Sequence, residues 1–139
     1  SMPTQDIQMF KTEGGEGFAV LNGPDEQLVA GLAIGADGGI GGTYGVMPEL
    51  YLKIKELVDG GKIREAREVQ DAANQIIYGM CACHGNLYAV IKEILRIREG
   101  LDLGSIRKPL PALIPEDMEQ VRECVKMVDE AVALAERLA

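Results

Sequence analysis

Two short apolar segments of this chain end in residues that could bind a polar ligand. Phe18-Ala19-Val20-Leu21 runs into Asn22-Gly23-Pro24-Asp25-Glu26, and the stretch from Ala36 to Ile40 runs into Gly41-Gly42-Thr43-Tyr44-Gly45. Carboxylates accept hydrogen bonds, and glycines let a ligand or a neighbouring backbone come close. In barrels of alternating strands and helices, the chemistry gathers at such strand ends.

Asp25 and Glu26 also have a purely structural interpretation. Pro24 and Asp25 suit the entry of a helix, which Asp25 would cap and whose dipole Glu26 would complement. From the residues alone this interpretation is favoured, because acids are common in the first turn of helices.

A metal centre and a nucleotide site are the two other chemistries that the sequence suggests. Cys81-x-Cys83-His84 carries the only histidine of the chain, whereas zinc needs four ligands with suitable reach. We therefore expect no metal and no cofactor, and we expect Cys81, Cys83 and Cys124 to be free thiols. The glycines from Gly35 to Gly45 fit neither a dinucleotide-binding nor a phosphate-loop pattern, so tight backbone packing explains them better.

The elements that must position these residues follow from periodicity and punctuation. The two apolar segments predict parallel strands, with a helix between them that Gly35 closes and a second helix that runs from Pro48 to Gly60. A weakly amphipathic stretch, Thr4 to Phe10, predicts a short helix before the first strand. Two strands cannot bury a sheet by themselves, so we expect further strands to complete the fold.

Helical periodicity continues from Lys62 to the end of the chain. Apolar stripes predict one helix up to the region of Gly79 to Gly85, a second from Leu87 to just before Gly100, and a third from about Glu116 to Arg137. Pro109, Pro111 and Pro115 predict a non-helical linker between the second and third helices. The tail is therefore expected to hold three long helices.

Composition restricts the possible partners. The chain has 139 residues, a net charge of -8 and 47% apolar residues, enough for one packed core. The negative charge opposes binding to nucleic acid and to anionic membrane surfaces. No apolar run approaches the roughly 20 residues of a membrane span, and the amino terminus lacks the plan of a signal peptide, so we expect a soluble cytoplasmic protein.

Several stretches resemble the N-acetylneuraminate lyase family, class I aldolases of the dihydrodipicolinate synthase superfamily. The resemblance rests on Leu21 to Glu26, on Gly35 to Tyr44 and on Met47-Pro48-Glu49-Leu50-Tyr51. The tail agrees through three further stretches: Ala66 to Gln70 with Asn74, Ile91 to Leu95, and Arg107 to Leu110.

The resemblance implies an α/β fold, namely the last two β/α units of a (β/α)8 TIM barrel followed by a three-helix carboxyl-terminal extension. Residues 1–59 would close the barrel and residues 60–139 would form the extension. The family is usually a homotetramer that holds pyruvate as a Schiff base while it reversibly cleaves sialic acid. Its Schiff-base lysine, on the sixth strand, would precede Ser1, so the isolated chain is expected to be inactive.

The resemblance also implies a substrate-binding role for six residues. Gly23, Asp25, Glu26 and Gly41 match positions that contact the hydroxyl-rich tail of the sugar, and Ile40 lies at the pyruvate end through its backbone. Gly42 stands where these lyases often carry a serine, and Gly45 replaces an asparagine. These departures leave the exact sugar or ketoacid open.

Lys11 is not expected to be the nucleophile. Lys11-Thr12-Glu13-Gly14 superficially mimics the lysine motif, but it stands only 14 positions before Asp25 and leaves no room for a crossover helix. A Schiff-base lysine also needs an apolar or cationic setting, whereas the surroundings of Lys11 are polar and rich in glycine.

We therefore expect the carboxyl-terminal portion of a sialic acid lyase, inactive alone and self-associating through uncovered strand edges. Its partners would be a small-molecule substrate in the full enzyme and copies of the chain. Two alternatives remain open: a non-catalytic, self-associating module, and another pyruvate-dependent aldolase such as a dihydrodipicolinate synthase.

Overall fold

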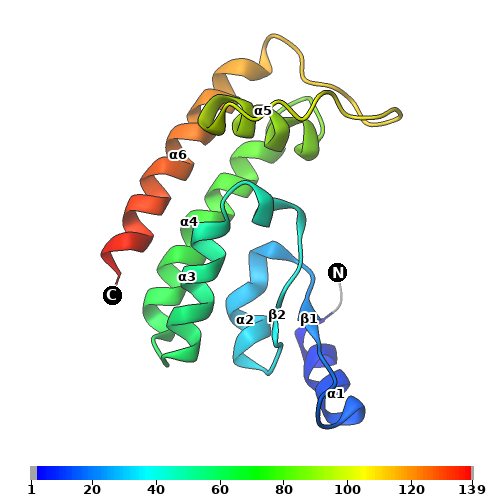
Figure 1. Cartoon of the computed structure of the whole chain (residues 1–139), viewed down its shortest axis with the longest axis vertical. Helices are drawn as coiled ribbons and strands as arrows, with labels where there is room; N and C mark the ends of the chain where they lie inside the picture. The colour runs from blue at the N-terminus through cyan, green and yellow to red at the C-terminus, as the bar shows by residue number, and fades with distance from the viewer. Residues whose placement is uncertain (1–2, 139) are drawn as a thin grey trace.

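Two short parallel strands, each followed by a helix, lead into three long helices in the computed structural model, which describes residues 3–138 (Figure 1). Ser1 begins the expected barrel segment 1–59 and Ala139 ends the expected extension 60–139; both lie outside the described residues. A helix, α1 (Thr4–Gly14), precedes the strands; it is longer than predicted and buries Ile7.

The two strands, β1 (Leu21–Asn22) and β2 (Gly38–Gly39), pair in parallel with Leu21 opposite Gly38 and Asn22 opposite Gly39. Each is shorter than predicted, and β1 begins later than expected. The extended backbone nevertheless continues on both sides of the pair, because the Asp37 amide donates to the Val20 carbonyl (2.8 Å) and the Ile40 amide donates to the Asn22 carbonyl (2.9 Å). The parallel strand pair is therefore confirmed, with only its central residues in regular pairing.

The connections after the strands each begin with a single turn. After β1 come the 3₁₀ turn η1 (Asp25–Gln27) and α2 (Leu28–Ala33), and after β2 come the 3₁₀ turn η2 (Gly42–Gly45) and α3 (Pro48–Asp59). Pro48 occupies the first helical position of α3, where its missing amide proton costs nothing.

The three predicted tail helices are α4 (Ile63–Cys81), α5 (Leu87–Glu99) and α6 (Asp117–Arg137). Figure 1 shows α3, α4 and α6 side by side, with α5 across one end and the linker that follows α5 extending away. The Asn86 side chain caps α5 by accepting a hydrogen bond from the Tyr88 amide (3.0 Å).

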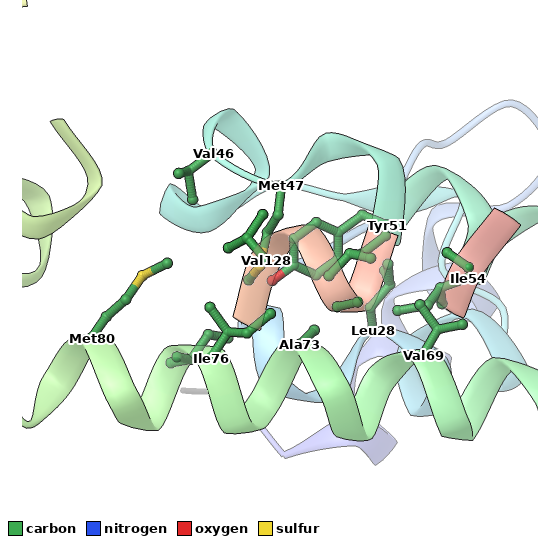
Figure 2. Close-up of a cluster of buried hydrophobic side chains, with 14 of the residues drawn as sticks. Leu28, Val46, Met47, Tyr51, Ile54, Val69, Ala73, Ile76, Met80 and Val128 are labelled. Carbon is green, nitrogen blue, oxygen red and sulfur yellow. The ribbon is translucent and has the colours of Figure 1, made fainter. Parts of the chain in front are cut away.

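One hydrophobic core joins the strand-helix units to the tail. Figure 2 shows Val69, Ala73, Ile76 and Met80 of α4 directed toward a cluster that includes Leu28. The remaining labelled members of this cluster come from α3, from the segment before it and from α6: Val46, Met47, Tyr51, Ile54 and Val128. The core thus runs across the division expected at residues 59 and 60, which coincides with the turn between α3 and α4.

Asp117 fastens the start of α6 to the turn before α5. Its buried carboxylate accepts hydrogen bonds from the amides of His84 (2.7 Å), Gly85 (3.1 Å) and Ile114 (3.1 Å), and one from the His84 ring. Burial alone would raise the pKa of the Asp117 carboxyl, but these hydrogen bonds outweigh it and hold the pKa well below its usual range.

Within residues 3–138, no helix has the length and apolarity that crossing a membrane would require.

Candidate functional site

The carboxyl ends of β1 and β2 bring the two predicted binding loops together. Because the strands are parallel and in register, the loop of Gly23 to Glu26 and the loop of Ile40 to Gly42 leave the sheet at the same edge. Both loops lie beside the tail, since η1 contacts α4 and η2 contacts α5. The sequence-predicted site residues therefore share one end of the structure.

Asp25 joins the two loops. Its side chain is buried, with 8% of the residue exposed, and Oδ2 accepts hydrogen bonds from the amide (2.8 Å) and from the hydroxyl of Thr43 in η2. Asp25 makes no side-chain cap on its own turn; it binds the turn that follows the other strand. The carboxylate thus fixes the distance between the two loops.

Tyr51 extends this junction into the core. The Thr43 hydroxyl donates its one proton to Asp25, so the Tyr51 hydroxyl must be the donor in its 2.5 Å contact with Thr43. The Tyr44 ring stacks on Tyr51 with the centroids 4.0 Å apart. Burial, reinforced by the Asp25 charge, raises the pKa of Tyr44 to about 12 and also raises the pKa of Tyr51. Both phenols therefore stay protonated at neutral pH.

Glycine is required at positions 41 and 42 because neighbouring side chains lie too close for a Cβ. A Cβ on Gly41 would lie 1.4 Å from Oδ1 of Asp25, so this carboxylate oxygen occupies the space that any side chain at position 41 would need. A Cβ on Gly42 would lie 2.8 Å from the ring of Tyr88. Gly42 therefore faces an aromatic ring across a very short distance.

The other predicted contacts are accessible. Glu26 and Gly23 are exposed, and Ile40 is 65% exposed beyond the end of β2. Within the described chain, the carboxylate of Glu26 is thus free of the enclosure that surrounds Asp25. The two neighbouring acids have different settings: one is buried in the junction and the other is presented at the strand ends.

Lys11 lies at the opposite edge of the strand pair. Its ammonium group donates to the Asp37 carboxylate (3.0 and 3.1 Å) and to the Phe18 carbonyl (2.8 Å), both of which precede the strands. The pKa of Asp37 is lowered, first by a hydrogen bond from the Val20 amide and then by Lys11. Lys11 is therefore remote from the two loops.

Cysteine and histidine form no metal cluster in the described part of the chain. Cys81 is exposed, Cys83 is partly buried and Cys124 is buried, and all three are free. No group of three or more His, Cys, Asp or Glu side chains among residues 3–138 could hold a metal ion. Burial raises the pKa of the Cys83 thiol to about 11, with a further contribution from Asp117, so this thiol stays protonated at neutral pH.

Residues that sequence reasoning missed complete the site. Thr43 and Tyr51 form the junction, and Tyr88, 51% exposed, covers Gly42 from the first turn of α5. Gln70, which is buried in α4, binds the loop after β1 from below. Only Gln70 gave a signal in the sequence, because an amide side chain among the apolar positions of a helix must find partners.

Residues 2–128 match the model of the dihydrodipicolinate synthetase family. The chain is 60% identical over 131 residues to an N-acetylneuraminate lyase of Mediterraneibacter gnavus, a match that covers 94% of this chain and 42% of the relative. An N-acetylneuraminate lyase of Fusobacterium nucleatum is 36% identical over 77% of this chain and 36% of its own length.

Solved structures give the same match. The wild-type sialic acid aldolase of Ruminococcus gnavus superposes with a TM-score of 0.92 at 60% identity, over 94% of this chain and 44% of that structure. The N-acetylneuraminate lyase of Fusobacterium nucleatum gives a TM-score of 0.81 at 31% identity, over 91% of this chain and 42% of that structure.

The chain spans less than half the length of these relatives, and the matched part consists of the last two β/α units of a TIM barrel with the helical extension. The resemblance predicted from the sequence is thereby confirmed. The chain belongs to the dihydrodipicolinate synthetase family.

Proposed function

We propose that this chain is the carboxyl-terminal portion of a pyruvate-dependent class I aldolase that reversibly cleaves N-acetylneuraminate, and that it supplies the sugar-binding half of the pocket. One observation carries the proposal: Asp25 and Thr43 join the two strand-end loops, so the exposed Glu26 and the backbone of Gly41 share one edge. The 60% identical relative, an N-acetylneuraminate lyase, supports the choice of substrate.

The six predicted substrate-binding residues have different roles in this proposal. Glu26 offers an exposed carboxylate to the hydroxyls of the sugar tail, and the backbones of Gly23 and Gly41 lie close enough to the solvent for a substrate to reach them. Asp25 sets the distance between the loops and Gly41 leaves room for it. Ile40 faces the pyruvate end through its backbone, and Gly42 with Tyr88 borders the sugar tail.

Three lysines of the described chain lack the setting of a Schiff-base nucleophile. Lys11 and Lys55 form ion pairs with Asp37 and Asp59, and Lys92 donates to two backbone carbonyls. A nucleophilic amine must lose its proton near neutral pH, which an apolar or cationic setting promotes and an ion pair opposes. We therefore expect residues 3–138 alone to form no covalent adduct with pyruvate.

The inner face of the strand pair supports completion by further strands. Leu21 is 49% exposed between buried Val20 and Asn22, and Phe18 and Ile40 are exposed as well. Along a barrel strand, side chains point alternately outward and into the barrel, where the other strands of the barrel cover them. The exposed side chain of Leu21 fits an inward position. The isolated chain has no such cover within the described residues, so we expect it to self-associate. Light scattering at micromolar concentration tests this, and a folded monomer would contradict it.

Borohydride trapping tests whether the Schiff-base lysine lies outside this chain. We define the chimera as the part of the 60% identical Mediterraneibacter gnavus relative that precedes the matched segment, fused to this chain. With pyruvate and borohydride, mass spectrometry should find one reduced adduct on the chimera, in the relative's part, and none on the chain alone. The chimera should also release pyruvate from N-acetylneuraminate. An adduct on a lysine of this chain, or a folded chimera that leaves N-acetylneuraminate intact, would contradict the proposal.

A second candidate is another pyruvate-dependent aldolase. Gly42 favours it, because the serine that often adds a hydroxyl contact in sialic acid lyases is absent here. Assaying the chimera with aspartate semialdehyde and pyruvate distinguishes the two, since a dihydrodipicolinate synthase would condense them. A non-catalytic, self-associating module remains the third candidate, and we place all three in the cytoplasm.

A further inference from the structure

Two amide side chains of α4 bind the loop that follows β1. Gln70 Oε1 accepts a hydrogen bond from the Val29 amide (3.1 Å), and Gln70 Nε2 donates to the Asp25 carbonyl (3.1 Å). Gln70 is 8% exposed. One buried side chain of the helical tail therefore ties down both the start of η1 and the first turn of α2.

Asn74 continues this contact one helical turn later. Its Oδ1 accepts from Gln70 Nε2 (2.9 Å) and its Nδ2 donates to the Glu26 carbonyl (3.1 Å). The backbone carbonyls of both candidate acids are thus bound by α4. We call Gln70 and Asn74 the amide clamp.

The chemistry of the clamp requires carboxamides. Gln70 must accept from one backbone amide and donate to one backbone carbonyl, which neither a carboxylate nor an ammonium group can do. Asn74 likewise accepts from Gln70 and donates to Glu26. The spacing of four residues places both on one face of α4.

We propose that the amide clamp is a positioning device for the sugar-binding loop, so that the helical tail, and not the barrel alone, sets the substrate affinity of the site. This inference rests on the proposed function of Glu26. A bound Glu26 carbonyl fixes the backbone from which the carboxylate reaches the sugar tail. Because that tail is remote from the bond that breaks, loosening the clamp weakens binding of substrate and transition state alike.

Solvent beside the clamp should limit the loss of stability that a clamp variant causes. An open hollow of about 560 Å³ borders the clamp on α4, lined by Arg64, Arg67, Glu68, Gln70, Asp71 and Asn74. Both clamp side chains line this hollow, so water lies beside the clamp. Loss of the clamp should therefore free the loop without unfolding the chain.

Kinetics of the chimera provide the first test, with Gln70→Met and Asn74→Ala as the variants. Each should raise KM for N-acetylneuraminate about three- to tenfold, as expected for lost hydrogen bonds, and leave kcat within about twofold. Gln120→Met is the matched control, because Gln120 Nε2 donates to the Gly79 carbonyl (3.2 Å) and joins α6 to α4 without touching the loop. An unchanged KM in both clamp variants, or an equal rise in the control, overturns the proposal.

Amide hydrogen exchange of the chain itself provides a test that is independent of activity. Gln70→Met should speed exchange of the Val29 amide about tenfold, because its acceptor is lost, whereas Gln120→Met should not. If the chimera with the intact clamp is inert, the proposed function fails, and exchange still decides whether the clamp holds the loop. Unchanged exchange at Val29 would overturn the clamp even in an active chimera.

Discussion

The Thr43 hydroxyl should be worth more to stability than any other hydroxyl of the strand-end loops. Thr43→Val keeps the shape of the side chain and the backbone bond to Asp25, but it removes the donor to the carboxylate and the acceptor of Tyr51. A hydrogen bond to a charged group contributes roughly 1.5–3 kcal/mol, and an unsatisfied buried hydroxyl costs about 1–3 kcal/mol. Since Tyr51 is 3% exposed, water cannot easily replace the lost partner.

We therefore expect Thr43→Val to lower the free energy of unfolding by about 3 kcal/mol. With a urea dependence of about 1–3 kcal/mol per molar, the midpoint should fall by about 1–3 M, measured by circular dichroism at 222 nm. Thr12→Val is the matched control. The exposed Thr12 hydroxyl donates to a carbonyl of its own helix, Gln8 (3.1 Å), so the change should stay within about 0.5 kcal/mol.

Tyr51→Phe guards against a Thr43 variant that does not fold. It removes one end of the same chain of hydroxyls and should cost about 1 kcal/mol. The double variant should cost less than the sum of the two, because the variants share a partner. A Thr43→Val midpoint equal to that of the unmodified chain, or strict additivity with Tyr51→Phe, would refute the hydroxyl chain.

Three further predictions concern the glycines and the tail. Gly41→Ala should lower the free energy of unfolding by about 2 kcal/mol or more, and with it the thermal midpoint, whereas Gly45→Ala, with open space around its Cβ, should not. Asp117→Asn should destabilise the chain at pH 7; the difference should shrink as pH falls below 4 toward the lowered folded-state pKa, because a depressed pKa stabilises only the ionised form. Gly42→Ser should lower kcat/KM of the chimera severalfold through collision with Tyr88, and adding Tyr88→Ala should restore part of it. Equal midpoints for the alanine pair, a pH-independent Asp117→Asn penalty or no rescue by Tyr88→Ala would each contradict its prediction.

The fold was largely predictable because its signals are local. Pro48 and the glycines at positions 60 and 61 marked α3, and apolar stripes marked the tail helices close to their observed bounds. The strands were predicted in the right places but too long. Regular pairing needs partners on both sides, and within the described residues β1 and β2 have only each other.

The candidate site was predictable in its loops but not in its contacts. The sequence brought Asp25 and Gly41 to one sheet edge, but it could not show that the carboxylate turns inward onto Thr43. That choice depends on the register of two strands and on a residue 18 positions away. Tyr88 was missed for the same reason, since only the packing of α5 against η2 places its ring over Gly42.

The most direct test of the central claim is a crystal structure of the chimera reduced with borohydride in the presence of N-acetylneuraminate. We predict a sugar tail whose hydroxyls lie within hydrogen-bond distance of the Glu26 carboxylate and of the Gly41 backbone, with Asp25 still bound to Thr43. A trapped sugar that extends away from both loops, with Glu26 left in solvent, would contradict the assignment of this chain as the sugar-binding half of the site.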